Sequence, residues 1–78
     1  MKKQILLSAL EQRKHEVLGY QINIDNYHRA IEYMRINYDP DLESFADQLN
    51  QLLKTEILEQ KKAKVIMTVI EQQLAELS

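Results

Sequence analysis

The sequence predicts an all-α fold, a long antiparallel helical hairpin that dimerises into a four-helix bundle. The 78 residues include one Gly and one Pro, too few for the many turns of a β protein. Apolar residues recur at helical spacing in both halves, and the only strong helix-breaking segment, 37–41, lies near the midpoint. We therefore expect a single domain with helices over about 2–37 and about 40–77 and a turn over 38–41.

A heptad repeat of apolar residues runs through the first half. Its two rows are Leu10, Val17, Ile24, Ile31 and Tyr38 and, three residues later, Leu6, Tyr20, Tyr27 and Met34. Such rows indicate a long helix with a packed seam. Residues 18–26 have low helix propensity, so a three-helix bundle with a break near Gly19 is the alternative. We favour the continuous helix because the rows keep their phase through Gly19.

The turn sequence indicates where the first helix ends and the second begins. Pro40 cannot continue a helix from its N-terminal side, but it is favoured at the first position of a new helix. Asp39 is then a natural N-cap, and Asp41 and Glu43 add negative charge where the helix dipole favours it. The second helix is therefore expected to begin at Pro40.

The second half continues the pattern with a polar interruption. We assign to its seam Leu42, Phe45, Leu49 and Leu52, with Ala46 and Leu53 beside them, and then Ala63, Ile66, Met67, Ile70, Leu74 and Leu77. Between these groups, the seam positions fall on Glu56, Glu59 and Gln60. We favour a solvated stretch here, because long polar side chains can extend from a seam to water. The alternative is a buried polar layer that sets the register of the helices.

Each helix carries a second apolar stripe away from its seam. The stripes are Leu18, Ile22, Tyr33 and Ile36 on the first helix and Leu58, Val65 and Val69 on the second. Two stripes per helix require two neighbours, and a homodimer of hairpins is the simplest way to supply them. The stripe on the first helix is our candidate partner-binding face if the dimer does not bury it.

Basic and acidic residues separate along the predicted hairpin. Pairing about the turn places residues whose numbers sum to near 79 side by side. This pairing groups Lys2, Lys3, Arg13, Lys14, Lys61, Lys62 and Lys64 at one end, with Asp39, Asp41, Glu43 and Asp47 at the other. The separation favours an antiparallel dimer. Alternatively, Arg13, Lys14, Lys61, Lys62 and Lys64 bind nucleic acid, although the net charge of -2 disfavours this.

No residue pattern indicates catalysis, a metal or a cofactor. The chain has no Cys, and one Gly excludes a Gly-rich phosphate loop. His15 with Glu11, and His28 with Glu32, offer two ligands each, too few for a zinc site. The apolar run 5–10 is too short for a secretory signal, and no segment is long enough to span a membrane. We expect a cytoplasmic protein that is not an enzyme.

Three segments resemble small uncharacterised helical accessory proteins of tailed phages and prophages. They are Tyr20-Gln21-Ile22-Asn23-Ile24-Asp25-Asn26-Tyr27, Leu49-Asn50-Gln51-Leu52-Leu53 and Glu59-Gln60-Lys61-Lys62. The resemblance implies an accessory protein that binds a host or phage partner, and it implies no catalytic residues. The sequence thus favours a non-enzymatic protein-interaction module that acts as an adaptor, inhibitor or regulator. The alternative is a small RNA- or DNA-binding regulator that uses the basic end of a hairpin dimer.

Overall fold

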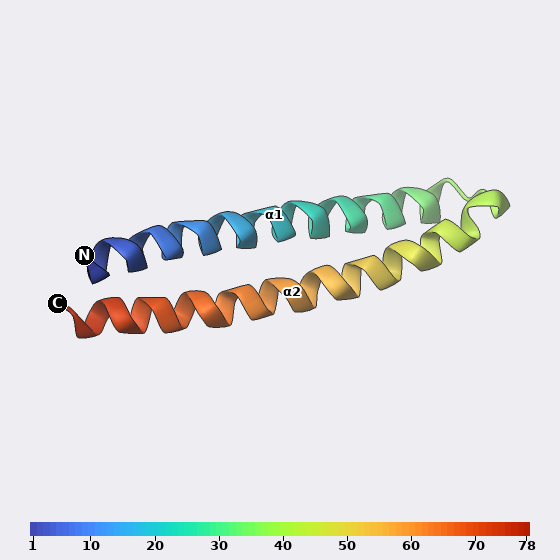
Figure 1. Ribbon diagram of the computed structural model, residues 1–78. Coiled ribbons are helices and arrows are strands. Elements are labelled where there is room, and N and C mark those ends of the chain that lie inside the picture. Colours follow the sequence, from blue (N-terminus) through green and yellow to red (C-terminus); the bar gives the residue numbers. More distant parts are fainter.

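Two long antiparallel helices make up almost the whole molecule. The computed structural model describes residues 1–78, with α1 over Lys2–Ile36, a short 3-10 turn η1 over Pro40–Leu42, and α2 over Glu43–Glu76. The helices run side by side, and the two chain ends lie together opposite the turn (Figure 1). The molecule measures 57 × 14 × 14 Å, which is a rod two helices thick. The predicted all-α hairpin is confirmed for the single chain.

Helix α1 passes through Gly19 without a break, so the alternative three-helix bundle is wrong. Gly19 is exposed, and apart from its chain neighbours and the adjacent backbone of α1 no atom lies within 4 Å of the position that a Cβ would occupy there. The low intrinsic propensity around Gly19 is overcome because the helix packs along its length against α2, and packing supplies most helical stability in proteins.

The turn is closed by side chains as well as by the backbone. Asp39 acts as the predicted N-cap, its Oδ1 accepting a hydrogen bond of 2.9 Å from the backbone N–H of Asp41. A helical segment begins at Pro40, as predicted, but its first three residues are a 3-10 turn and the α-helix starts at Glu43. Pro40–Leu42 forms a tighter 3-10 turn because the Leu42 N–H donates to the Asp39 carbonyl at 3.0 Å. At the end of α1, the Asn37 side chain donates to the Tyr33 carbonyl at 3.1 Å.

The seam of α1 follows the predicted heptad rows. All the apolar members of these rows that lie within the helix are buried or half-buried: Leu6, Leu10, Val17, Tyr20, Ile24, Tyr27, Ile31 and Met34. Tyr38 was assigned to the same seam, and that prediction is wrong. It lies beyond the end of α1 and is 69% exposed.

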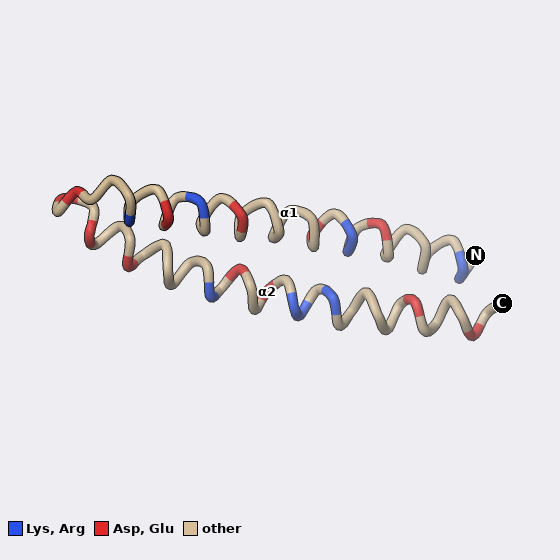
Figure 2. The backbone as a smooth tube through the Cα atoms, turned by 180° about the vertical axis from the view of Figure 1, so that it is seen from behind, with Lys and Arg blue, Asp and Glu red and all other residues tan.

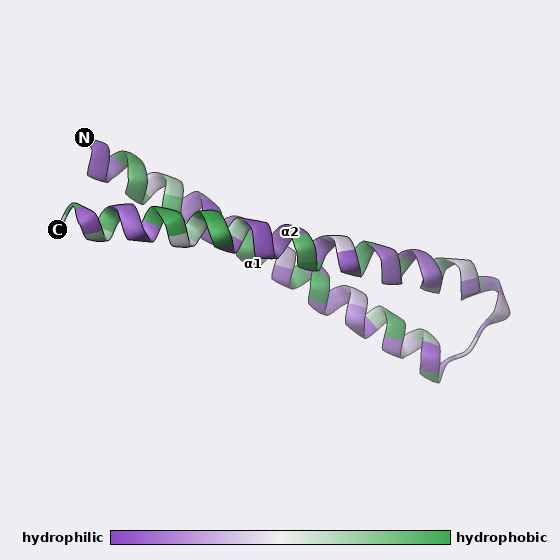
Figure 3. Cartoon of the chain, turned by 90° about the horizontal axis from the view of Figure 1, so that it is seen from below, coloured by the Kyte–Doolittle hydropathy of each residue, from purple (hydrophilic) through white to green (hydrophobic).

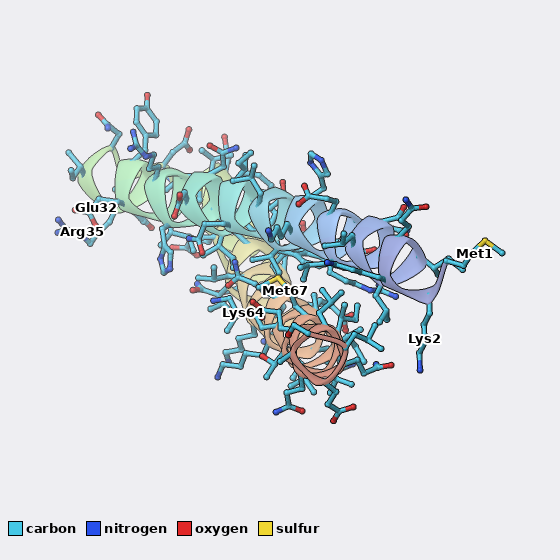
Figure 4. The ribbon with its side chains drawn as sticks, turned by 90° about the vertical axis from the view of Figure 1, so that its left-hand side faces the viewer. Met1, Lys2, Glu32, Arg35, Lys64 and Met67 are labelled. Carbon is cyan, nitrogen blue, oxygen red and sulfur yellow. The ribbon has the colours of Figure 1, made fainter.

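The seam of α2 is offset from part of the prediction. All of its buried positions and four of its half-buried ones form two rows, each with seven-residue spacing: 46-53-60-67-74 and 49-56-63-70. Met67 is seen between the helices in Figure 4. Phe45, Leu52 and Ile66 lie outside the seam and are exposed, as are Leu42 and Leu77 at the helix ends, so these five seam assignments are wrong.

Side-chain size explains the offset of the α2 seam. At two points along the seam a large residue of α1 lies opposite an alanine of α2, although other seam positions of α2 hold Leu49, Leu53 and Ile70. Met34 shares a surface hollow with Ala46, and Tyr20 shares another with Ala63. Both alanines therefore take seam positions, while their larger neighbours Phe45 and Ile66 point outward.

A buried polar layer lies at the middle of the hairpin. Gln60 is 7% exposed, and its Nε2 donates to the Val17 carbonyl at 3.1 Å and to Gln21 Oε1 at 2.9 Å. The favoured prediction of a solvated stretch is therefore wrong at Gln60, while Glu56 and Glu59 are half-buried. These contacts fall near the midpoints of α1 and α2, and the helices cross near their middles (Figure 3).

The hairpin leaves much of its apolar surface uncovered. Seven residues are buried, and none has a side chain below 2% exposure. The accessible surface is 6057 Å², whereas a compact monomer of 9.2 kDa exposes about 4,900 Å². The excess exposed area arises because each helix has only one neighbouring helix.

Candidate functional site

The predicted partner-binding residues lie together on the side of α1 that faces away from α2. Leu18, Ile22, Tyr33 and Ile36 are 53–66% exposed, and we call this set the outer face of α1. Their positions fall opposite the seam rows of the same helix. The structure thus brings all four onto one face, as the helical spacing predicts.

The outer face of α1 consists of two apolar pairs with polar residues between them. Leu18 and Ile22 are one turn apart, as are Tyr33 and Ile36. The eleven residues from Ile22 to Tyr33 separate the pairs by about 16 Å along the helix. Exposed Asp25 lies in this interval and accepts a hydrogen bond of 3.0 Å from Gln21 Nε2. The face is therefore segmented rather than continuous.

The stripe on α2 is also exposed. Leu58, Val65 and Val69 are 52%, 61% and 43% exposed. Leu58 and Val65 share one row of the heptad, opposite the seam of α2. We call these two residues the outer pair of α2, and they serve below as a control for the outer face of α1.

One side of the hairpin carries a further apolar surface, which we call the lateral face. Its α2 row is Phe45, Leu52, Glu59 and Ile66, and its α1 row is Ala9, Glu16, Asn23 and Ala30, each with seven-residue spacing. Glu16, Glu59 and Ile66 line the same shallow hollow, so the two rows border the same side of the rod. Both ends of the lateral face are apolar, and its centre is polar.

The opposite side of the hairpin is mainly polar. Gln60 reaches Gln21 there, and Arg35 and Glu43 line one hollow on that side. Apart from Leu7 and Ile57, the rows on this side are Lys14, Gln21, His28 and Arg35 on α1 and Glu43, Asn50, Lys64 and Glu71 on α2. Apart from Leu7 and the hollow at the turn, the uncovered apolar surface of the two sides lies on the lateral face.

Sequence reasoning missed the lateral face because it placed Phe45, Leu52 and Ile66 in the seam. The sequence does contain a signal for this face. Phe45, Leu52 and Ile66 repeat at intervals of seven and fourteen residues, next to the two rows that form the seam of α2. Two adjacent sets of rows indicate a helix with two packed neighbours. The choice between seam and lateral face required the position of α1.

The basic residues proposed for nucleic-acid binding are spread along half of the rod rather than gathered at its end. Figure 2 shows acidic segments among them. Arg13 binds Glu16 at 2.9 Å, Lys14 binds Glu11 at 3.4 Å, and Lys62 binds Glu59 at 3.0 Å. Of the five predicted residues, only Lys61 and Lys64 make no ion pair within the chain. The local pairs reduce the positive potential available to phosphates.

The turn end carries a cluster of hydrogen-bonded charged groups beside an apolar hollow of about 190 Å³. The Tyr38 hydroxyl donates to Glu43 Oε1 at 2.5 Å, and this hydrogen bond, with some desolvation, raises the Tyr38 pKa. Arg35 donates to both oxygens of Glu32, which lowers the Glu32 pKa and raises that of Arg35. The two side chains lie together on α1 in Figure 4. All these groups are exposed, so the cluster orders the turn without forming an enclosed site.

The structure gathers no group of three His, Cys, Asp or Glu side chains suited to a metal ion. The carboxylates one turn from the histidines are held by cations, since Glu11 binds Lys14 and Glu32 binds Arg35. No helix combines the length and apolar character needed to cross a bilayer.

Comparison of the chain with protein-family models, curated proteins and solved structures gives no match. The resemblance to accessory proteins of tailed phages and prophages therefore stays a prediction.

Proposed function

We propose that this chain is a non-enzymatic protein-interaction module that acts as an adaptor, inhibitor or regulator of another protein. The observation that carries the proposal is the outer face of α1, where four large apolar or aromatic side chains stand more than half exposed on a rigid helix. The surface hollows support it, because their volumes of about 190 and 170 Å³ fall below the roughly 300–1,000 Å³ of small-molecule pockets.

The spacing of the outer face indicates how a partner would bind it. Helices that dock into grooves present anchors at intervals of three, four and seven residues. Here the two anchor pairs, Leu18 with Ile22 and Tyr33 with Ile36, lie about 16 Å apart. The centres of the two pairs are about 22 Å apart along the helix, so the partner is expected to offer an apolar groove with two pockets at that distance and polar groups between them. Tyr33 is the strongest anchor, because tyrosine combines a large apolar ring with a hydrogen-bonding group.

The proposal is tested by using the immobilised full chain to capture binding proteins. Wild type is compared with a variant of the outer face and with a matched control variant. The double variant Tyr33→Glu with Ile36→Glu removes one anchor pair of the outer face. The control Leu58→Glu with Val65→Glu makes the same change at the outer pair of α2. A partner retained by wild type and control should lose about 30-fold or more in affinity for the outer-face variant. Circular dichroism checks that both variants keep their helix content.

Two results would count against this function. If every captured protein binds the outer-face variant as tightly as wild type, the outer face of α1 is not the binding site. If no protein is captured in an amount that rises with the amount of the chain, the proposed interaction function is refuted.

One observation favours nucleic-acid binding as a second candidate. The half of the rod that contains residues 1–19 and 60–78 holds seven Lys and Arg but four Glu. Binding through Lys61 and Lys64 would weaken steeply as salt rises, because phosphate contacts release counterions. An electrophoretic shift with RNA or DNA at low salt, lost in Lys61→Gln with Lys64→Gln, would support this candidate; no shift at low salt would exclude it.

A further inference from the structure

We propose that the lateral face binds a second copy of this chain in antiparallel orientation, giving a bundle of four helices. This goes beyond the interaction with another protein, since it uses a different surface and names its occupant. It does not depend on the outer face of α1, which would remain on the outside of the bundle.

The exposed area supports an extensive contact between two copies. Two separate hairpins expose twice the 6057 Å² of one chain. A compact protein of twice the mass would expose about 8,200 Å², which is about 3,900 Å² less. Obligate homodimers bury about 2,000–5,000 Å². The surplus surface of this rod is thus of the size that a stable dimer covers.

The order of residues on the lateral face has the symmetry that a twofold contact requires. In a twofold interface the same surface meets itself. In the α2 row, Leu52 lies one heptad before Glu59 and Ile66 one heptad after it, while the next positions outward are Phe45 and Gln73. A twofold axis at Glu59, perpendicular to the rod, therefore places Leu52 of each chain against Ile66 of the other.

The α1 row has the same symmetry. Ala9 and Ala30 lie almost equally far from the middle of α1, so the same axis places Ala9 of one copy near Ala30 of the other. The alanines allow the two α1 helices to approach closely at these positions, while Glu16 of one copy lies near Asn23 of the other beside the axis. The axis also passes near the midpoint of α2, so the two rods overlap along their full length.

Charge selects the antiparallel orientation. Residues 20–59, the turn half, carry three basic and eight acidic residues, whereas the terminal half carries seven basic and four acidic. Figure 2 shows the concentration of acidic residues at the turn. An antiparallel pair sets each turn half against the terminal half of the other copy, whereas a parallel pair would set like against like.

The polar centre of the lateral face is compatible with this contact. Both copies place Glu59 near the axis, and like charges that close would oppose association. Each Glu59 is held by its own Lys62 at 3.0 Å, and each Glu16 by its own Arg13 at 2.9 Å. The carboxylates near the axis are therefore already paired with cations of their own chain, which reduces the repulsion between the two copies.

Sedimentation equilibrium of the full chain tests the occupant and the face. We expect wild type to have twice the 9.2 kDa mass of one chain. Phe45→Glu with Ile66→Glu should raise the dimer dissociation constant by about 100-fold or more, because each places a charge in the contact. Leu58→Glu with Val65→Glu adds the same charge to the same helix outside the contact and should remain a dimer. A monomeric wild type, or a control weakened as much as the lateral-face variant, would overturn the proposal.

Disulfide formation tests the orientation without relying on a destabilised variant. The chain has no Cys, so single cysteines report on one position each. Glu59→Cys should cross-link two copies rapidly, because residues at a twofold axis meet their own equivalents and a disulfide needs Cα atoms within about 7 Å. The neighbouring Leu58→Cys points away from the contact and should not. A parallel pair would set Glu59 against α1 of the other copy, so equal rates for the two variants would refute the antiparallel arrangement.

Discussion

The buried amide of Gln60 offers the sharpest test of how the hairpin is held together. Replacing it by Ala removes two hydrogen bonds, which join Nε2 to the Val17 carbonyl and to Gln21 Oε1. Each such bond contributes about 0.5–1.5 kcal/mol net. Neither acceptor is left unsatisfied, since the Val17 carbonyl keeps its bond within α1 and the exposed Gln21 amide turns to water. We therefore expect Gln60→Ala to lower the free energy of unfolding by about 1–3 kcal/mol.

Gln60→Leu should behave differently from Gln60→Ala, because the site is almost closed to water. Burying a Leu side chain contributes about 1.5–3 kcal/mol, which equals or exceeds the hydrogen bonds lost. The Leu variant is expected to be at least as stable as wild type. The polar layer would then cost stability while it favours one register of the helices over others.

Urea denaturation followed by circular dichroism measures both changes, at one fixed chain concentration so that any association contributes equally. Gln21→Ala is the control, since it removes one acceptor at an exposed position and should cost less than about 1 kcal/mol. A Leu variant as unstable as the Ala variant would refute the reasoning. An Ala variant with wild-type stability would show that Gln60 is solvated.

Three further predictions concern the helix, the turn and a titration. Gly19→Ala should raise the free energy of unfolding by about 1 kcal/mol in urea denaturation, because the site is exposed, in mid-helix and open to a Cβ; no gain would argue against a continuous α1. Asp39→Ala should lower it by about 0.5–2 kcal/mol by removing the cap on the Asp41 N–H, whereas Asp39→Asn should retain most of the stability. Glu43→Gln should bring the raised Tyr38 pKa back toward its ordinary value, followed as the phenolate absorbance that Tyr38→Phe removes. Because the pKa of Tyr38 is higher in the folded state than in the unfolded state, the contribution of the Tyr38–Glu43 hydrogen bond to stability is present at neutral pH and is lost as the pH rises through the folded-state pKa. An unchanged Tyr38 pKa in Glu43→Gln would contradict the assignment of the raised pKa to Glu43.

The fold could be read from local features of the sequence. The seven-residue rows in 6–34, the lack of other Gly and Pro, and Asp39 before Pro40 each depend on short-range chemistry, and the structure agrees with them. The pairing of residues whose numbers sum to near 79 is also confirmed. Gln60 donates hydrogen bonds to Val17 and Gln21, and the Asn23 side chain donates one to Glu56. Once the helices and the turn are placed, this register follows.

The lateral face could not be read in the same way. Phe45 lies four residues before Leu49 and Ala46 lies three before it, and both intervals are compatible with a shared helix face. Hydrophobicity alone favours burying the larger residue, Phe45. The structure reverses the choice at two points, where Met34 and Tyr20 of α1 lie beside Ala46 and Ala63 of α2. Gln60 was misjudged for a related reason, because its acceptors lie on the other helix. Both errors concern which side chains are buried, and this depends on contacts between the two helices.

The assignments of the three surfaces are compatible with one another because they occupy different angles around each helix. The seam joins α1 to α2, the lateral face lies to one side of it, and the outer face of α1 lies opposite. A small protein with few buried residues commonly gains its remaining stability by association. Burying Phe45, Leu52 and Ile66 between two copies would supply that stability without covering Tyr33 or Ile36. The dimer would then present the outer face twice, so that a partner with two matching grooves would be held more tightly than by either face alone.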